Sequence, residues 1–321
     1  MSRLENKKIV LIGGGTGNAV LLRSLKKHTE NISVIVSVGD DGGSSGKLRR
    51  EMGIIPPGDI RNCLVAMADE ENIMAMVMDK RFQSGFMNKQ SLGNIILAAL
   101  FDMTGNFPKA IRMISDVLAI KGKVFPVTVE NIALAAEFEN GKTARGESRL
   151  ASYALRHKTA IKRIKLIPEA PPLWSECRRA IREADVIIYS PGSLYTSLIP
   201  NLLVKDMCDE LESAGARKIY LPNIMTEHGE TDGFGISDLL DKIEEHSGGK
   251  KIIDTVIYSI SDIPEGVKKS YAKEKASAIK NQIEERHREK YKFIEADIAL
   301  IKNNTVRHNA EEIWEILKKE I

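Results

Sequence analysis

The chain has 321 residues, of which 43% are hydrophobic and 28% charged, and its formal net charge is +3 at pH 7. This composition is typical of a globular protein with one or two domains and argues against a disordered chain. So small a net charge gives no reason to expect a nucleic-acid partner. Cys63, Cys177 and Cys208 lie far apart without a C-x-x-C pair, so neither a disulfide framework nor a thiolate metal site is expected.

The N-terminal segment, MSRLENKKIVLIGGG, contains only a short apolar run after its charges. That run is too short for a signal-peptide core or a membrane span. We therefore expect a cytoplasmic protein without a membrane span. Base rates for such proteins favour a homodimer.

Apolar runs of strand length alternate along the chain with longer segments of helical periodicity. The predicted strands are residues 7–12, 32–38, 132–138, 161–167, 185–188, 218–221, 252–258 and 297–301. The predicted helices are residues 16–28, 59–68, 92–101, 108–120, 173–183, 237–246 and 309–319. Continuous apolar strands separated by helices indicate a doubly wound α/β fold, in which helices cover both faces of a mostly parallel, Rossmann-like sheet.

We expect residues 1–321 to form a single domain with two additions to this core. Residues 124–165 have the pattern of consecutive strands with a turn at ENGKT, which predicts a small β-rich insertion. Residues 264–292 carry a dense run of charges, which predicts a solvated helical segment. The alternative for this segment is a flap that faces an anion.

A doubly wound fold binds its ligand at the carboxyl ends of the strands, so the residues after each strand are the first candidates. After the first strand, Gly13, Gly14, Gly15 and Thr16 open a helix. Glycines allow a close approach of the backbone, and the free N–H groups of a helix start favour an anion. The dinucleotide fingerprint G-x-G-x-x-G fails at its third glycine, which is Asn18 here. A purely structural tight turn is the alternative.

The second strand is followed by SVGDDGGSSGKLRR, residues 37–50. A Walker motif would need glycine at Asp41 and Ser or Thr at Leu48, so this stretch is not a P-loop. Residues 42–46 still predict a backbone nest for an anion, and the two aspartates are able to hold hydroxyl groups or Mg²⁺. A solvent-exposed turn with aspartate caps is the alternative. The candidate contacts in this stretch are Asp40, Asp41, Gly43, Ser44 and Ser45.

Three later loops are also polar and rich in small residues. PPGDIRN places Asp59 at a helix start, where capping alone explains an acid. SPGSLYTSLIPNLL and LPNIMTEHGETDGF each follow a predicted strand. The hydrolase elbow does not fit at Ser193, and His228 has no H-x-x-x-H partner, so we expect neither a nucleophile nor a zinc site. The candidates for anion or hydroxyl contacts are Asn62, Gly192, Ser193, Asn223 and Thr226.

Taken together, these motifs resemble the YvcK-like gluconeogenesis-factor family (UPF0052), within the superfamily of 2-phospho-L-lactate transferases, the CofD-like proteins. The matching stretches are GGGTG, DDGGSSGKLR, PPGDIRN, SLGNIILAAL, SPGSLYTSLIPNLL, NIMTEHGETDGF and the late Arg-His pair. The resemblance implies a Rossmann-like core, a cytoplasmic bacterial protein, and a role in growth on gluconeogenic carbon sources and in cell shape. It also implies binding of a UDP-sugar, notably UDP-N-acetylglucosamine, without an established catalytic activity.

The resemblance further implies individual ligand contacts. The family's Y-x-x-E-x-A motif falls on Tyr271 and its R-H motif on Arg307, and both are linked to the nucleotide-sugar. Asn94, in the SLGN stretch, is a further expected contact. The chain departs from the family pattern at Gln90, where histidine is common, and at Glu227, where glutamine is common.

Three functions are open at this point. The one we expect is a regulatory protein that binds a UDP-sugar without turnover. The second is a Mg²⁺-dependent phosphotransferase or nucleotidyltransferase in which Asp40, Asp41 or Asp59 holds the ion. The third is a dinucleotide-binding protein with Asp40 on a ribose. Transfer of 2-phospho-lactate is not expected, because the deazaflavin-binding residues of the transferase relatives are not found in the sequence.

Overall fold

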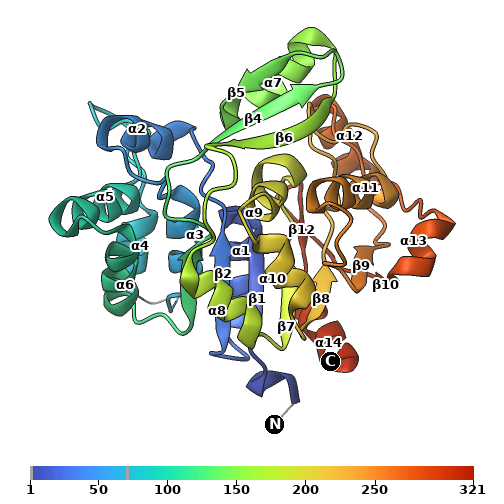
Figure 1. Ribbon diagram of the computed structural model, residues 1–321, viewed down its shortest axis with the longest axis horizontal. Coiled ribbons are helices and arrows are strands. Elements are labelled where there is room, and N and C mark those ends of the chain that lie inside the picture. Colours follow the sequence, from blue (N-terminus) through green and yellow to red (C-terminus); the bar gives the residue numbers. More distant parts are fainter. Residues whose placement is uncertain (1–2, 70–71) are drawn as a thin grey trace.

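Seven parallel strands form the central sheet of the computed structural model, which describes residues 3–69 and 72–321 (Figure 1). The strand order is β10-β9-β8-β7-β1-β2-β3. The strands are β1 Ile9–Gly13, β2 Ile32–Val36, β3 Lys123–Pro126, β7 Val186–Tyr189, β8 Arg217–Tyr220, β9 Thr255–Ser259 and β10 Lys292–Ala296. Every residue of β1 and β7 is buried, which explains their continuous apolar sequences. The predicted doubly wound α/β fold is confirmed.

Helices connect these strands and cover both faces of the sheet (Figure 1). Within the described ranges, none of them is long and apolar enough to cross a membrane. The helices are α1 Gly15–Leu25, α2 Gly43–Met52, α3 Gly58–Met67, α4 Ile73–Asp79, α5 Leu92–Thr104, α6 Phe107–Val117, α7 Glu147–His157, α8 Ser175–Glu183, α9 Ile199–Leu202, α10 Met207–Ser213, α11 Ile236–Ser247, α12 Glu265–Lys273, α13 Glu285–Lys290 and α14 Ala310–Glu320, with the short turns η1 Arg3–Asn6 and η2 Leu194–Leu198.

The order of strands reverses between β1 and β7. The chain adds β2 and β3 on one side of β1, and later adds β8, β9 and β10 on the other side of β7. Right-handed crossovers therefore place the helices of the two halves on opposite faces. On one face His28, in the turn that follows α1, stacks on Trp314 of α14, with 4.7 Å between the ring centres. On the other, Arg178 of α8 pairs with Glu210 of α10. The gap between β1 and β7 is the switch point at which such folds bind ligands.

A small antiparallel unit stands at the end of the molecule opposite both termini (Figure 1). Its strands β4 (Ala133–Phe138), β5 (Thr143–Arg145) and β6 (Ile161–Ile167) pair in the order β5-β4-β6. The expected run of consecutive strands from residue 124 to residue 165 was wrong in two details. Its first part pairs with β2 as strand β3 of the main sheet. Helix α7 also interrupts the run, because the buried Leu150 and Ala154 follow helical spacing.

The secondary structure of residues 264–302 also differs from the prediction. The charged segment 264–292 contains two short helices, α12 and α13, with irregular chain between them. The strand expected at residues 297–301 is β11 (Ala299–Lys302), which pairs with β12 (Thr305–His308) outside the main sheet. One edge of the main sheet is β10, whose partly exposed sequence KFIEA lacks the apolar run of a buried strand.

The stretch SVGDDGGSSGKLRR also has more regular structure than expected. Helix α2 begins at Gly43 and is ended by Gly53, which adopts the left-handed conformation at φ +66°. The Gly46 N–H donates to the Gly42 carbonyl at 2.7 Å. The nest predicted at residues 42–46 is therefore the first turn of a helix, whose N–H groups have the same preference for negative charge.

Candidate functional site

A cavity of about 450 Å³ lies at the switch point between β1 and β7. Segments far apart in the sequence line it: the turns after β1, β2, β7 and β8, the first residues of α3 and α7, and parts of α12 and β12. The lining residues are Gly14, Gly15, Thr16, Gly17, Val20, Asp40, Asp59, Glu147, Pro191, Gly192, Ser193, Ser197, Asn223, Ile224, Met225, Thr226, Glu227, Tyr271, Val306, Arg307 and His308.

The glycines of the first turn let three segments meet at the floor of this cavity. A Cβ atom on Gly15 would lie 2.5 Å from the Asp59 Cα, and one on Gly17 would lie 1.5 Å from the Pro191 carbonyl oxygen. Both distances are shorter than any side chain permits. These glycines are therefore explained by the close packing of α1 against α3 and against the loop after β7, which is the alternative of a purely structural turn. The same turn still borders the cavity.

Three carboxylates gather on one wall of the cavity. Asp59 accepts a hydrogen bond from the Gly15 N–H, and burial together with the charge of Asp40 raises its pKa to about 6. Burial, followed by the charges of Asp40 and Asp59, raises the pKa of Glu147 to about 8, although the Thr196 hydroxyl donates to it. Near neutral pH, part of this wall is therefore protonated and able to donate hydrogen bonds.

The loops after β7 and β8 form a second wall. Asn223 joins the two loops, because its amide oxygen accepts from the Gly192 N–H at 2.8 Å and its amide nitrogen donates to the Gly192 carbonyl at 2.9 Å. The Ser193 hydroxyl donates to Glu230. Burial and the neighbouring Glu230 carboxylate raise the pKa of Glu227 to about 7. This wall thus adds two more carboxyl groups with raised pKa values, Glu227 and Glu230, to those around Asp59.

The C-terminal elements complete the cavity. The Tyr271 hydroxyl accepts a hydrogen bond from the Val306 N–H at 3.0 Å and so ties α12 to β12. Arg307 is exposed, and its guanidinium forms no ion pair or hydrogen bond with any described residue. It is also the only Lys or Arg among the described lining residues. Burial lowers the pKa of His308, which contacts the Pro222 carbonyl at 3.0 Å, to about 4, so this ring is neutral at physiological pH.

The structure brings most of the predicted contacts together at this cavity. Gly13 is the last residue of β1 and lies directly before the lining turn. The Thr226 hydroxyl accepts from the Ser277 N–H at 2.9 Å, so it also holds the segment that follows α12. The predicted residues that line the cavity are Gly14, Gly15, Thr16, Asp40, Asp59, Gly192, Ser193, Asn223, Thr226, Tyr271 and Arg307.

The remaining predicted contacts do not line the cavity, and several of them hold neighbouring elements in place instead. Ser44 and Ser45 are buried, and Asn94 of α5 donates to the Ser45 hydroxyl at 3.4 Å. Asp41 accepts from the Ser148 N–H at 3.0 Å and so caps α7. The residues outside the lining are Asp41, Gly43, Ser44, Ser45, Asn62 and Asn94.

The sequence did not identify Glu147 and Glu227 as site residues. Glu147 lies in a segment that we expected to be strand, although the helical spacing of Leu150 and Ala154 after it was a usable signal. Glu227 stood out only as a departure from the family pattern. Both are brought to the cavity by loops whose path no local pattern predicts.

Among the described residues, no three His, Cys, Asp or Glu side chains stand close enough together to ligate a metal ion. Asp40 and Asp59 both line the cavity, and Mg²⁺ is commonly held by one or two carboxylates together with phosphate oxygens of a ligand. The residues present therefore fit Mg²⁺ only in the company of an anionic ligand.

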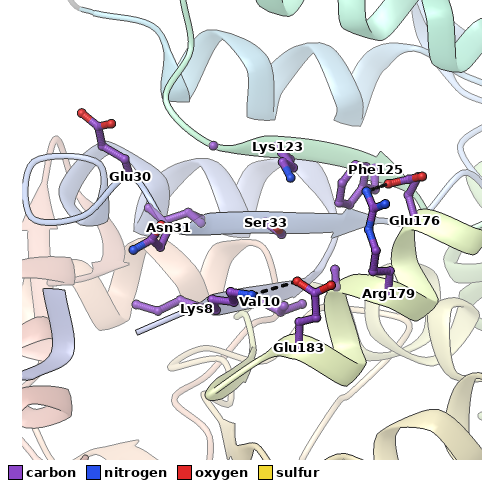
Figure 2. A pocket seen from close by; sticks show the side chains of 14 residues that line it. Lys8, Val10, Glu30, Asn31, Ser33, Lys123, Phe125, Glu176, Arg179 and Glu183 are labelled. Atoms are coloured by element: carbon purple, nitrogen blue, oxygen red, sulfur yellow. Dashed lines mark hydrogen bonds and ion pairs between the residues drawn. The ribbon is translucent and has the colours of Figure 1, made fainter. Parts of the chain in front are cut away.

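A smaller cavity of about 200 Å³ lies at the amino ends of β1, β2 and β3, and Figure 2 shows its charged side chains. Lys8 pairs with Glu183 at 2.9 Å, and Arg179 pairs with Glu176. Because these charges already neutralise one another, this surface offers an ionic ligand less than the cavity at the carboxyl ends does.

Comparisons with known proteins cover nearly the whole chain. Residues 9–299 match the family model described as 2-phospho-L-lactate transferase CofD. The chain is 42% identical to the gluconeogenesis factor of Bacillus subtilis (strain 168) over 314 residues, which is 98% of each chain. It is 41% identical to the gluconeogenesis factor of Halalkalibacterium halodurans over 318 residues, 98% of this chain and 96% of that one. The crystal structure of a UPF0052 family protein from Bacillus halodurans is similar to it with a TM-score of 0.92 at 41% identity, covering 97% of this chain and 99% of that one.

Proposed function

We propose a function for this chain from the premise that it belongs to the CofD family, among the gluconeogenesis factors of that family. It is a cytoplasmic regulatory protein that binds a UDP-sugar of the UDP-N-acetylglucosamine type in the cavity between β1 and β7. Through this ligand it acts in growth on gluconeogenic carbon sources and in cell shape. The observation that supports this proposal most directly is that Arg307, Tyr271 and the start of α1 border one cavity.

The chemistry of the lining suits each part of such a ligand. The guanidinium of Arg307 has no partner among the described residues and matches the oxygens of a diphosphate as a planar fork of donors. The N-terminus of α1 adds a partial positive charge on the same cavity. Carboxylate and amide groups, as on Asp40 and Asn223, bind sugar hydroxyls well. A volume of about 450 Å³ lies within the ordinary range for small-molecule sites.

The gathered carboxylates impose a condition on anion binding. A diphosphate beside Asp59, Glu147 and Glu227 is repelled while these groups are ionised. Their raised pKa values allow them to take up protons when the ligand arrives, after which they donate hydrogen bonds to it. Binding in this way requires no metal ion and no bond cleavage, which favours a sensor over an enzyme.

Calorimetric titration with UDP-N-acetylglucosamine tests the proposal. We expect saturable binding and intact nucleotide at the end of the titration. Arg307→Gln removes the free cation and should weaken binding roughly tenfold to a hundredfold, the cost of a lost charge-assisted hydrogen bond. Arg288→Gln is the matched control, because Arg288 is exposed and does not line the cavity. The proposal fails if the protein ignores UDP-N-acetylglucosamine at millimolar concentration but binds another nucleotide, such as NAD⁺.

A Mg²⁺-dependent phosphotransferase or nucleotidyltransferase is the second candidate, favoured by the presence of Asp40 and Asp59 in one cavity. It requires a product. Incubation with Mg²⁺ and UDP-N-acetylglucosamine would then release UMP, UDP or phosphate, and Asp59→Asn would stop the release. If the nucleotide stays intact over a day with saturating protein, the transferase is rejected and the regulatory function is favoured.

A further inference from the structure

The β-rich insertion carries a second concave surface, separate from the ligand cavity. It is a groove of about 440 Å³ between β5 and α7. Its residues on α7 follow the i, i+3, i+4, i+7 spacing of a single helix face. We call it the arginine groove, and its lining residues are Ala144, Arg145, Arg149, Ser152, Tyr153 and Arg156.

The positive charge of this groove is uncompensated. Arg145, Arg149 and Arg156 are exposed, and their guanidinium groups form no ion pair or hydrogen bond within the described part of the chain. Residues 133–167 contain eight Lys or Arg and three Glu, whereas the whole chain has a net charge of only +3. Of these acids, Glu147 lines the ligand cavity and Glu137 pairs with Lys162 at 3.2 Å. The outer surface of the insertion is therefore strongly basic and the rest of the chain is not.

One wall of the groove is a free strand edge. In the order β5-β4-β6, strand β5 has a partner on one side only. Phe138 N–H donates to the Lys142 carbonyl, and Gly146 N–H donates to the Leu134 carbonyl. Because backbone groups alternate in direction along an antiparallel strand, those of Thr143 and Arg145 point away from β4. Among the described residues they meet no other strand.

The other wall of the groove is held rigidly. α7 packs on the insertion through the buried Leu150 and Ala154. In its first turn the Ser148 N–H donates to Asp41 at 3.0 Å. The preceding residue, Gly146, adopts φ +101° and leaves no room for a Cβ, which would lie 2.5 Å from Asp41 Oδ2. Arg149 and Arg156 therefore stand on a fixed helix that also carries Glu147 into the ligand cavity, whereas Arg145 lies on β5.

We propose that the arginine groove binds an extended acidic segment of a partner protein, which adds to β5 as a further strand. Backbone groups of Thr143 and Arg145 bond to the segment, and its carboxylates pair with the guanidinium groups of the groove. Other polyanions match the groove less well. Tyr153 already packs against Phe138 and His157, with 4.5 and 4.3 Å between ring centres, so it is not a free platform for a nucleic-acid base. A bilayer is flat, whereas this surface is concave.

The test uses the full chain and a fluorescent peptide of about ten residues with alternating Glu and Thr, whose carboxylates share one face when it is extended. We expect an anisotropy rise on binding. Replacing Arg145, Arg149 and Arg156 by Gln should weaken binding about tenfold or more. The matched control replaces Lys251, Arg288 and Lys319 by Gln; it removes the same charge from exposed positions elsewhere and should change affinity less than about twofold.

A second pair of variants tests strand addition itself. Thr143→Pro removes one outward N–H, which no bond of the β5–β4 ladder uses, and should weaken the peptide several-fold, while Thr143→Ala should not. Unchanged thermal unfolding of each variant shows that the insertion is still folded. The proposal is overturned if the two triple variants lose affinity equally or if Thr143→Pro has no effect. It is also overturned if oligouridylate of the same length binds more tightly than the peptide.

Discussion

At the amino end of the central sheet, charged side chains face one another and pair, whereas at its carboxyl end carboxylates gather without matching cations. Lys7 and Asp185 are 2.9 Å apart, and so are Lys8 and Glu183, which Figure 2 shows; these side chains are partly or well exposed. Across the sheet, Asp59 and Glu147 border a cavity in which the only Lys or Arg among the described lining residues is Arg307.

This difference separates what stabilises the molecule from what it does. Exposed ion pairs contribute at most about 1 kcal/mol each and leave the charge balanced. Buried carboxylates with raised pKa values destabilise a fold when they ionise, so their concentration at one end marks a site under a functional constraint. The same end also receives the glycine turn after β1, the starts of α1 and α3, and Tyr271 of α12.

The largest expected effect, on stability and ligand binding together, is that of a methyl group added to Gly17, at the carboxyl end of the central sheet. Gly17→Ala would place its Cβ 1.5 Å from the Pro191 carbonyl oxygen, so the loop after β7 must move. We expect the free energy of unfolding to fall by about 3 kcal/mol and UDP-N-acetylglucosamine binding to be lost. Chemical denaturation and calorimetry measure the two quantities.

Gly215→Ala is the control at the amino end, since a Cβ there meets no atom within 4 Å. It should change the free energy of unfolding by less than about 0.5 kcal/mol. If Gly17→Ala were as stable as the wild type and still bound ligand, the loop after β7 would not be held as tightly against α1 as the 1.5 Å approach indicates.

The second effect is a pH dependence of opposite sign at the two ends. Burial raises the pKa of Glu147 from its ordinary 4.5 to about 8, so the stability that its neutral form supports is complete below about pH 4.5 and is lost as the pH rises through 8. Glu147→Gln should therefore be more stable than the wild type at about pH 9, by at most about 5 kcal/mol because a pKa difference of one corresponds to about 1.4 kcal/mol, and equal to it near pH 4. Urea denaturation at the two pH values measures this difference.

Glu183, at the amino end of the sheet, should show the opposite pH dependence of stability. Its hydrogen bond and ion pair with Lys8 lower its pKa, so its contribution to stability is present above its ordinary pKa and is lost as the pH falls through the lowered one. Glu183→Gln should be slightly less stable than the wild type at pH 7 and equal to it in strong acid. A stabilising effect of Glu183→Gln at pH 7, or a destabilising one of Glu147→Gln at pH 9, would contradict the contrast.

The fold could be predicted wherever a strand is buried on both faces. β1, β2, β7 and β9 are mostly apolar runs, and their sequence alone indicated a parallel sheet with a ligand at its carboxyl ends. The edge strand β10 was missed because it is partly exposed and alternates less clearly. α7 was missed because a helix of this length between short strands has only two fully buried residues to mark its period.

The site could be predicted where it follows a strand directly. Asp40, Gly192 and Asn223 were found for this reason. Ser44 and Ser45 were misplaced because a polar, glycine-rich stretch has the composition of a loop, whereas the helix that forms there buries both serines against α5. Glu147 was missed because it reaches the cavity at the start of α7, in an insertion that was expected to be strand. The homodimer and the cytoplasmic location stay predictions.

The smallest effect, and the one that tests the carboxyl end most directly, is proton uptake on binding. A diphosphate raises the pKa of carboxylates beside it, and Asp59, Glu227 and Glu147, with pKa values of about 6, 7 and 8, bracket neutral pH. At pH 7.5 the protein should therefore take up a fraction of a proton per ligand, seen as a difference between calorimetric enthalpies in phosphate and Tris buffers. Glu147→Gln should reduce the uptake, and Mg²⁺ should suppress it if the ion neutralises the ligand instead. Proton release would show that the phosphates lie away from these carboxylates.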